Sequence, residues 1–558
     1  MSARQQPEQR VIPVKNDQTE ILISDLDKRV EARFIREGDP NLWSAIPYQA
    51  EGFSGVMLGY REGPHPVPIL VKLGIHGSYR IWLGLYSFIH LSEIRVRLSG
   101  DLCCHTIAPP QHLERISLPV LHEVCWKEAE LTGQDLMLEG AYNPDRHPGA
   151  LAYIRLEPVE KVPATEEKQV RYPLAITNDG YGIFGALPHT RPEDLLESFE
   201  GIPDGSCMRL LLWGCGEGDV CNYPTRVGTY QPYVSEACLS YFYHTLYSNR
   251  KRWKEKGWNS LKLVRDYARN RGWEFQVYLR VESFYAQYPF ERIRSKFFLD
   301  HPEYHCFDQE GQRVGRLSYA YPEVREHILR LISEIADYDP DGVCLAFVRG
   351  VPLVLYEPIM VEGFREKHGV DPRTLDELDP RWLAYQAEII TPFLESVRTI
   401  LKPHQRLSAI VPGNESDCRR WGLDVASWVK SGIVDDLFPL GQRFTEEDVH
   451  VDSPEHLDFQ YFHQLKGREH KRVIPMLYPW NKFQDDYEGW RRCLFSFLDQ
   501  GGDGYAVWDG TKHIDQIGDI GYEARSSEWM PPKTEFRAVK LLTLNGYRFD
   551  RYHHFEVV

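Results

Sequence analysis

The spacing of apolar and polar residues divides the chain into two parts. In the first part short apolar runs are separated by turn residues, and in IRVRLSG the residues Ile94, Val96 and Leu98 share one face while two arginines take the other. Many short strands without helices between them are typical of an antiparallel sandwich or jelly roll. The pattern therefore predicts an N-terminal β-sandwich over residues 41–160, preceded by a charged N-terminal arm over residues 1–40.

The pattern changes after the charged, proline-containing stretch EKVPATEEK, which is expected to be a linker over residues 161–170. Beyond it, strand-like apolar runs alternate with amphipathic segments, as in parallel βα units. Eight strands are expected, at Leu174–Asn178, Met208–Gly214, Glu274–Val281, Gly342–Val348, Leu407–Val411, Asp436–Pro439, Val473–Tyr478 and Gly504–Trp508. The expected helices include Ser260–Asn270, Pro322–Ala336, Pro380–Ile400, Leu423–Ser431, Pro454–Lys466, Asp486–Asp499 and, last, Lys533–Leu544.

This order of elements favours an α/β fold, a closed (β/α)₈ TIM barrel over residues 171–558. A doubly wound open sheet rarely reaches eight strands alternating with helices. No Gly-x-Gly-x-x-Gly motif follows the first strand, which disfavours a dinucleotide-binding fold. Active sites of such barrels lie at the carboxyl ends of the strands and in the loops that follow them. That rule turns the strand positions into a short set of candidate residues.

Composition narrows the function classes. The chain has 558 residues, of which 42% are hydrophobic, and its formal net charge of −16 disfavours nucleic acid as a partner. No apolar run approaches the ~18 residues of a membrane span, and the polar start MSARQQPEQRVIPVKNDQTE lacks the apolar core of a secretory signal. We therefore expect no membrane association and a cytoplasmic location, with secretion as the alternative if a leader was removed. The sequence does not indicate an oligomeric state.

The cysteines and histidines give no sign of a metal site. The 11 cysteines show no paired C-x₂-C spacing, so free or buried thiols are expected, and the histidines form no ligand-spaced cluster. Neither a metal nor another cofactor is predicted. The 14 tryptophans and 31 tyrosines, in contrast, favour a carbohydrate ligand, because sugar rings stack on flat aromatic side chains.

Polar and aromatic side chains follow the predicted strands. The acids are Asp179, Glu217, Glu282, Glu357, Glu415 and Asp509. Asn414 is a candidate for binding a sugar hydroxyl, and Arg280 and Arg349 for holding a substrate carboxylate or sulfate, which would suit an acidic sugar. Pairing of the arginines with nearby acids is the alternative. The stacking candidates, each of which core packing would also explain, are Trp213, Tyr478, Trp480 and Trp508.

Two segments resemble a known family. YPEVREHILRLISEIADYDPDGVCLAFVRG and WGLDVASWVKSGIVDDLFP are similar to the fourth-strand and sixth-strand regions of bacterial family-ten-like glycoside-hydrolase barrels, in which "D-G-[IV]-x-L-D-[FY]-x-R" and "W-x-x-W-V-x-x-G-x-[IV]-D" segments recur. The resemblance covers roughly residues 300–440 and implies a barrel that hydrolyses O-glycosidic bonds. Ala346 stands where the family pattern carries an acid, so a role for that carboxylate is absent or has moved.

Glycoside hydrolysis needs two carboxyl groups beside the anomeric carbon, one to protonate the leaving oxygen and one to attack or to activate water. Glu357 lies in the apolar run VPLVLYEPIM, where desolvation should raise its pKa toward that of a general acid. Glu415 lies in a polar turn and is expected to stay ionised as nucleophile or base. Asp509 is the substitute if either points away, and Asp179 and Glu282 are further candidates.

Two other functions compete with a glycoside hydrolase. A polysaccharide lyase abstracts a proton with Tyr, His or Lys, often helped by Arg, and Arg280, Arg349 and several tyrosines keep that hypothesis open. A barrel that has lost an acid, as Ala346 suggests, would bind glycans without cleaving them. In all three the expected partner is a carbohydrate.

Overall fold

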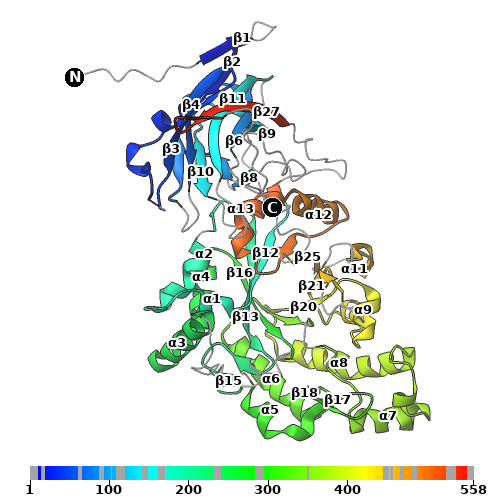
Figure 1. Cartoon of the computed structure of the whole chain (residues 1–558). Coiled ribbons are helices and arrows are strands. Elements are labelled where there is room, and N and C mark those ends of the chain that lie inside the picture. Colours follow the sequence, from blue (N-terminus) through cyan, green and yellow to red (C-terminus); the bar gives the residue numbers. More distant parts are fainter. Residues whose placement is uncertain are drawn as a thin grey trace. The chain divides into compact units, whose positions relative to one another are not determined.

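The computed structural model of the chain is shown in Figure 1. It describes residues 10–13, 19–39, 41–60, 66–86, 94–101, 104–107, 120–140, 149–160, 170–200, 202–230, 241–282, 294–348, 351–443, 451–452, 457–465, 471–478, 487–522 and 536–549. The chain forms two compact units. One comprises residues 1–168 together with 530–558, and the other residues 169–529.

The second unit is a closed barrel of eight parallel strands, which confirms the predicted barrel. In chain order these are β12 (Leu174–Asn178), β13 (Met208–Glu217), β16 (Glu274–Arg280), β19 (Gly342–Ala346), β20 (Arg406–Pro412), β21 (Asp436–Leu440), β25 (Met476–Leu477) and β26 (Tyr505–Val507). The barrel closes because β12 pairs with both β13 and β26, with Ile176 opposite Leu211 on one side and Val507 on the other. A short strand, β24 (Arg472–Val473), precedes β25 and pairs with the start of β21.

Helices and small hairpins connect these strands. The helices are α1 (Gly182–Ala186), α2 (Glu197–Glu200), α3 (Tyr241–Lys256), α4 (Ser260–Asn270), α5 (Lys296–Asp300), α6 (Pro322–Asp337), α7 (Pro358–His368), α8 (Pro380–Ile400), α9 (Glu415–Arg420), α10 (Val425–Lys430), α11 (Phe459–Leu465), α12 (Tyr487–Asp499) and α13 (Ile514–Ile517). Two of the predicted helix starts are well defined, because Asn259 and Asp379 accept backbone N–H groups of the first turns of α4 and α8. Short strands lie in the connections: β14 (Val220–Cys221), β15 (Thr229–Tyr230), β17 (His305–Phe307), β18 (Arg313–Leu317), β22 (Gln442–Arg443) and β23 (Val451–Asp452).

Side chains alternate between the barrel interior and the layer under the helices. One buried cluster contains every second residue of the strands, among them Ala175, Tyr278, Phe438 and Trp508. The other cluster is larger and packs the opposite faces of the strands against the helices. Each strand is therefore buried on both faces, as its continuous apolar run indicated. Among the described residues no helix is long and apolar enough to cross a membrane.

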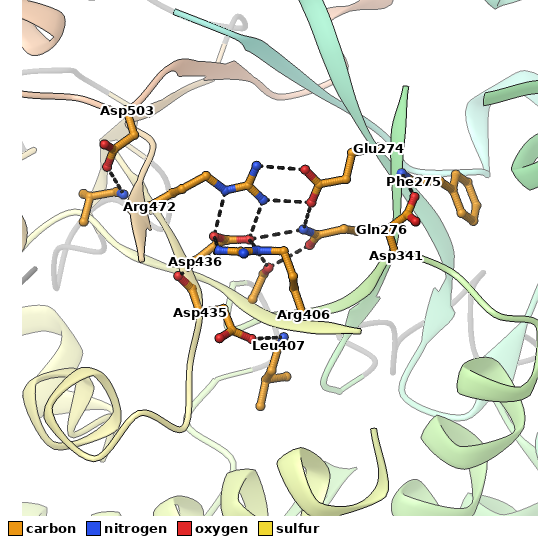
Figure 2. A network of polar contacts seen from close by, with 12 residues as sticks. Glu274, Phe275, Gln276, Asp341, Arg406, Leu407, Asp435, Asp436, Arg472 and Asp503 are labelled. Atoms are coloured by element: carbon orange, nitrogen blue, oxygen red, sulfur yellow. Dashed lines mark hydrogen bonds and ion pairs between the residues drawn. The ribbon is translucent and has the colours of Figure 1, made fainter. Parts of the chain in front are cut away.

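The end of the barrel where the strands begin is closed by a network of charged side chains around the buried Asp436 (Figure 2). Asp436, which is completely buried, accepts hydrogen bonds from Arg406 and Arg472, with Nε–O distances of 2.8 Å for both. Arg472 also holds Glu274 through two 2.8 Å hydrogen bonds, and Ser408 lies within 3.0 Å of Asp436. Burial alone would raise the pKa of Asp436, but the hydrogen bonds from the two arginines hold it at about 2.

The first unit is built from antiparallel strands. The larger sheet contains β1 (Arg10–Pro13), β2 (Thr19–Ile23), β3 (Ser44–Ala50), β4 (Phe53–Gly59), β6 (Ser78–Tyr86), β9 (Val120–Glu130), β11 (Ala150–Pro158), β27 (Phe536–Leu544) and β28 (Tyr547–Arg548). A smaller sheet contains β5 (Ile69–Val71), β7 (Ile94–Leu98), β8 (His105–Ile107) and β10 (Leu136–Gly140). One apolar core is shared by the two sheets, so the expected β-sandwich is an all-antiparallel, two-sheet unit. Part of the expected N-terminal arm belongs to the sheet, because β2 pairs with β11.

The end of the chain corrects two expectations. The predicted helix Lys533–Leu544 is wrong: this segment forms β27, which pairs with β9 and β3. The barrel unit therefore ends near residue 529 and not at 558. The apolar run FRAVKLLTL fits either period, and periodicity cannot separate a short buried strand from a helix. The segment becomes a strand because β3 and β9 each have a backbone edge without a partner strand. As a strand, β27 forms hydrogen bonds with both edges at once.

The sheet of the first unit closes on itself only through β27. Termination of the chain after Trp529 removes β27, leaves β3 and β9 as open edges and uncovers the site of the buried Leu541. We expect this truncation to lower the thermal unfolding temperature of the first unit by several degrees and to make it sensitive to limited proteolysis. Termination after Phe549 keeps β27 and β28 and is the matched control. Equal stability of the two truncated proteins would contradict the assigned role of β27.

The charged end of the barrel predicts a pH effect. The pKa of Asp436 in the folded protein is about 2, below its unfolded value, so the ion pairs stabilise the barrel above about pH 4 and this stability is lost as the pH falls toward 2. The difference corresponds to about 2 kcal/mol. We expect Asp436→Asn to cost about 3 kcal/mol at pH 7, because Arg406 and Arg472 then keep buried positive charge with less compensation. Urea unfolding at pH 7 and pH 3 measures both effects, and a variant as stable as the native protein at pH 7 would contradict them.

Candidate active site at the carboxyl ends of the barrel strands

Four charged side chains gather around one buried phenol where the barrel strands end. Tyr278 lies in the barrel interior and is 1% exposed. Burial raises the pKa of Tyr278 well above its usual range; the positive charge of Arg280 opposes this shift, and the carboxylates of Asp179, Asp509 and Glu217 reinforce it. These charges come from the ends of β12, β13, β16 and β26, so four strands contribute to one mouth of the barrel.

The two aspartates of the mouth are in direct contact through the backbone. Asp509 Oδ1 accepts a hydrogen bond from the backbone N–H of Asp179 at 3.3 Å, and the N–H of Asp509 donates to the hydroxyl of Thr177 at 2.8 Å. Asp509 has a φ of 47°, an uncommon conformation for a non-glycine residue that often marks a functional turn. The closure of the barrel therefore brings together residues 330 positions apart in the sequence.

The carboxylate of Asp179 is held in one orientation. Its Oδ1 accepts hydrogen bonds from the N–H groups of Tyr181 and Gly182, at 2.8 and 3.0 Å, at the start of α1. Among the residues that the structure describes, its Oδ2 has no hydrogen-bond partner, and the side chain is partly exposed. Asp179 therefore presents one free carboxylate oxygen at the mouth.

Aromatic rings form the floor of the mouth. The ring of Trp508 lies 5.7 Å from Tyr278 and 5.9 Å from Tyr478, and the Arg280 guanidinium lies 5.6 Å from its centre. Arg280 also forms an ion pair with Glu217. Trp508 is only 1% exposed, whereas Tyr478 is partly exposed. Of the two rings, Tyr478 is therefore the one that solvent can reach, and Trp508 lies against it.

Glu357, the first expected catalytic acid, is completely buried in its own loop. Its two carboxylate oxygens lie 3.1 and 2.9 Å from the backbone nitrogen of Leu355, and the residue precedes the first turn of α7. Burial raises its pKa, as expected from the apolar run, although hydrogen bonds from Leu355, Ser318 and Cys306 oppose the shift. The side chain thus acts as a buried acceptor for the loop that leads into α7.

Glu415 and Asn414, at the start of α9, are occupied by local contacts. Glu415 forms an ion pair with Arg419 at 2.6 Å, four residues further along the same helix, and its side chain is 41% exposed. The side-chain oxygen of Asn414 accepts the N–H of Asp417 and caps the helix. In the described part of the chain, no contact joins Glu415 to Glu357 or to the charges around Tyr278.

The other expected residues have different positions. Trp213 is completely buried and packs against Phe199 in the layer under the helices. It does not line the mouth, because its neighbours Leu212 and Gly214 take the inward positions of β13. Glu282, directly after β16, is 3% exposed. Arg349 and Trp480 lie outside the described residues. Ala346 is buried in the barrel interior.

Tyr278 was not among the predicted site residues. Glu217, which was expected at the end of a strand, forms an ion pair with Arg280. In EFQVYLR, alternation places Tyr278 on the same face as Gln276 and Arg280, which is the signal that would have found it. The described cysteines are free. No group of three or more His, Cys, Asp or Glu side chains in the described ranges is arranged to hold a metal ion.

Comparisons with known proteins return structures and no sequence relatives. No protein-family model matches the chain, and no curated protein matches it in sequence. A glycoside hydrolase domain of PgaB from Bordetella bronchiseptica is 12% identical with a TM-score of 0.40, covering 62% of this chain and 99% of that one. The α-galactosidase TtGalA from Thermus thermophilus is 13% identical with a TM-score of 0.34, covering 96% and 99%. A chitinase from Bacteroides thetaiotaomicron is 10% identical with a TM-score of 0.32, covering 60% and 89%.

These neighbours are glycoside hydrolases by name, and none is closely similar to this chain. The barrel itself is established by its strand pairing, independently of them. Function is therefore inferred from the residues at the mouth.

Proposed function

We propose that the barrel is a glycoside hydrolase that cleaves O-glycosidic bonds of an oligo- or polysaccharide at the mouth formed by Asp179 and Asp509. The observation that carries this proposal is the meeting of two aspartates from the first and last strands beside the aromatic floor of Trp508 and Tyr478. Two carboxyl groups that flank one bond are what glycoside hydrolysis requires. A flat aromatic surface next to them suits a sugar ring.

The two aspartates have different tasks in this proposal. Asp179, with one oxygen anchored by two backbone N–H groups and the other available, is the nucleophile or the base that activates water. Asp509 is the general acid and gives its proton to the glycosidic oxygen as the bond to the anomeric carbon breaks. Water then supplies a hydroxyl group to the anomeric carbon and a proton that restores Asp509. Glu217 is occupied by Arg280 and is assigned no proton transfer.

Arg280 does not favour an acidic sugar in this arrangement. Glu217 already neutralises Arg280, which was one of the two residues expected to hold a substrate carboxylate or sulfate. A neutral glycan is therefore the expected substrate. Tyr278 is also a poor base for a lyase, because burial raises its pKa far above the range in which a phenol ionises at neutral pH.

Substitution of either aspartate tests the proposal. The native protein is assayed on neutral and acidic polysaccharides for new reducing ends and for absorbance near 235 nm, which only a lyase would produce. We expect Asp179→Asn and Asp509→Asn each to lower turnover by at least about 10²-fold. Glu395→Gln, a change of an exposed acid on α8, is the matched control and should leave turnover unchanged.

Three outcomes would contradict the proposal. Unsaturated products would identify a lyase. Binding of a glycan without cleavage would identify a carbohydrate-binding barrel, as Ala346 suggested. Turnover above about a tenth of the native value in both aspartate variants would remove Asp179 and Asp509 from the chemistry.

The hypothesis from the sequence, with Glu357 as acid and Glu415 as base, is tested in the same assay. Because Glu357 holds its own loop and Glu415 pairs with Arg419 on the surface, we expect Glu357→Gln and Glu415→Gln each to keep more than about a tenth of native turnover. Circular dichroism confirms that both variants are folded. Loss of about 10²-fold in both folded variants would instead favour the Glu357–Glu415 pair.

A further inference from the structure

The turn that follows Asp179 is held by a buried arginine from α3. Arg250 is 2% exposed, and its guanidinium donates to the carbonyl of Gly180 at 2.8 Å and to the carbonyl of Asn222 at 2.9 Å. The ring of Phe184 lies 3.5 Å from the guanidinium carbon. In the described part of the chain Arg250 forms no ion pair. Its buried positive charge is surrounded by carbonyl groups and an aromatic ring.

The same turn is fixed from a second side. The side-chain amide of Asn222 donates to the carbonyls of Gly180 and Gly214, at 3.0 and 2.7 Å. Gly180 has a φ of 62°, and a Cβ atom there would lie 2.2 Å from the carbonyl oxygen of Gly214, so only glycine fits. The carbonyl of Gly180 thus accepts from two side chains at once. This arrangement leaves the backbone next to Asp179 a single conformation.

The charge of Arg250 acts on Asp179. Burial lowers the pKa of Arg250 to about 10, and the groups that oppose this shift are the phenols of Tyr230 and Tyr181 and the carboxylate of Asp179. An unpaired buried guanidinium is costly, and it persists where a structure or a function requires it. Here one of the groups that interact with the positive charge of Arg250 is Asp179, which presents a free carboxylate oxygen at the mouth.

We propose that Arg250 is a positioning residue for Asp179, which locks the turn behind the carboxylate and supplies the positive charge that keeps it poised for reaction. The inference rests on the proposed function, because it assigns Asp179 to the reaction. Arg250 itself contacts neither the mouth floor nor the second aspartate among its described contacts, so its effect on chemistry passes through Asp179.

Charge and position can be separated with two variants. Arg250→Met keeps the apolar stem and removes the charge and both hydrogen bonds, whereas Arg250→Lys keeps the charge with a shorter reach. We expect Arg250→Met to lower kcat by about 10- to 100-fold with KM changed less than about threefold, because a small displacement of a reacting group is costly and the aromatic floor is untouched. Arg250→Lys should recover part of the lost kcat.

The pH dependence of kcat/KM gives a readout that a purely structural role would not move. The charged and titratable groups around Asp179 are Arg250 from α3, Arg280 and Tyr278 in β16, Glu217 in β13, Asp509 at the end of β26, Tyr230 in β15 and Tyr181 in its own loop. Glu217 already pairs with Arg280, so loss of the Arg250 charge should move the acidic limb of the profile to higher pH in Arg250→Met, and Arg250→Lys should move it back. An unshifted limb together with native kcat in Arg250→Met would overturn the inference.

The double variant Asp179→Asn, Arg250→Met tests whether the two residues act as a unit. We expect Arg250→Met to have no further effect on the residual turnover of Asp179→Asn, because the residue that it positions is already gone. An equal loss of turnover in both backgrounds would show a general structural role and overturn the inference. If Arg250→Met does not fold, Asn222→Ala, which removes the second support of the Gly180 turn, is examined in its place with the same expectation for kcat and an unchanged acidic limb of the pH profile.

Thermal unfolding is compared for the native protein, Asp179→Asn, Arg250→Met and the double variant, and this measurement needs no substrate. Arg250 and Asp179 should be coupled, so that the Tm loss of the double variant is smaller than the sum of the single losses by about 1–3 °C. Additive losses would overturn the inference even if no glycan is cleaved. If Asp179→Asn remains fully active, the proposed function fails, while coupled unfolding would still show that Arg250 holds Asp179.

Discussion

Closure of eight parallel strands around one interior is the constraint on which the rest of this structure depends. Every strand turns alternate side chains inward, and the enclosed space must be filled in layers. The start of the barrel is filled by Asp436, Arg406 and their partners, the middle by apolar groups such as Phe438, and the far end by Trp508 with charged neighbours. The polar mouth is thus the upper layer of a packed core, and its residues are positioned by the same closure that holds the barrel together.

The two charged ends of the barrel differ in how their charges are compensated. At the start, Asp436 and Glu274 face Arg406 and Arg472, and every one of these side chains has a partner of opposite charge within the network. Behind the mouth, Arg250 meets carbonyl groups and an aromatic ring in place of a carboxylate. Fully paired buried charge is typical of a structural element, whereas incompletely paired charge next to an available carboxylate is typical of a site where chemistry occurs.

The division of the chain into units also follows from backbone pairing. The barrel segment lies, in sequence, between β11 and β27 of the antiparallel unit, so that unit is complete only after the barrel has been synthesised. Arg537 of β27 lies 4.5 Å from the centre of the Trp82 ring, whose environment also holds Arg155 at 4.6 Å. Strand β27 therefore contributes side-chain packing as well as hydrogen bonds to a sheet in which the strands from β1 to β11 lie more than 300 residues earlier.

The sequence by itself determined the local elements and the order in which they occur. Continuous apolar runs marked the barrel strands, amphipathic segments marked the helices between them, and the βα order placed acids such as Asp179 and Asp509 at strand ends, because all of these depend on residues a few positions apart. Only the tertiary structure decided which acids meet. Barrel closure joins the first strand to the last and so brings Asp179 to Asp509, while the loop of Glu357 folds on itself and the run FRAVKLLTL becomes a strand because two open edges accept it. The meeting of Asp179 with Asp509 and the pairing of FRAVKLLTL depend on contacts between residues hundreds of positions apart, which no local period encodes.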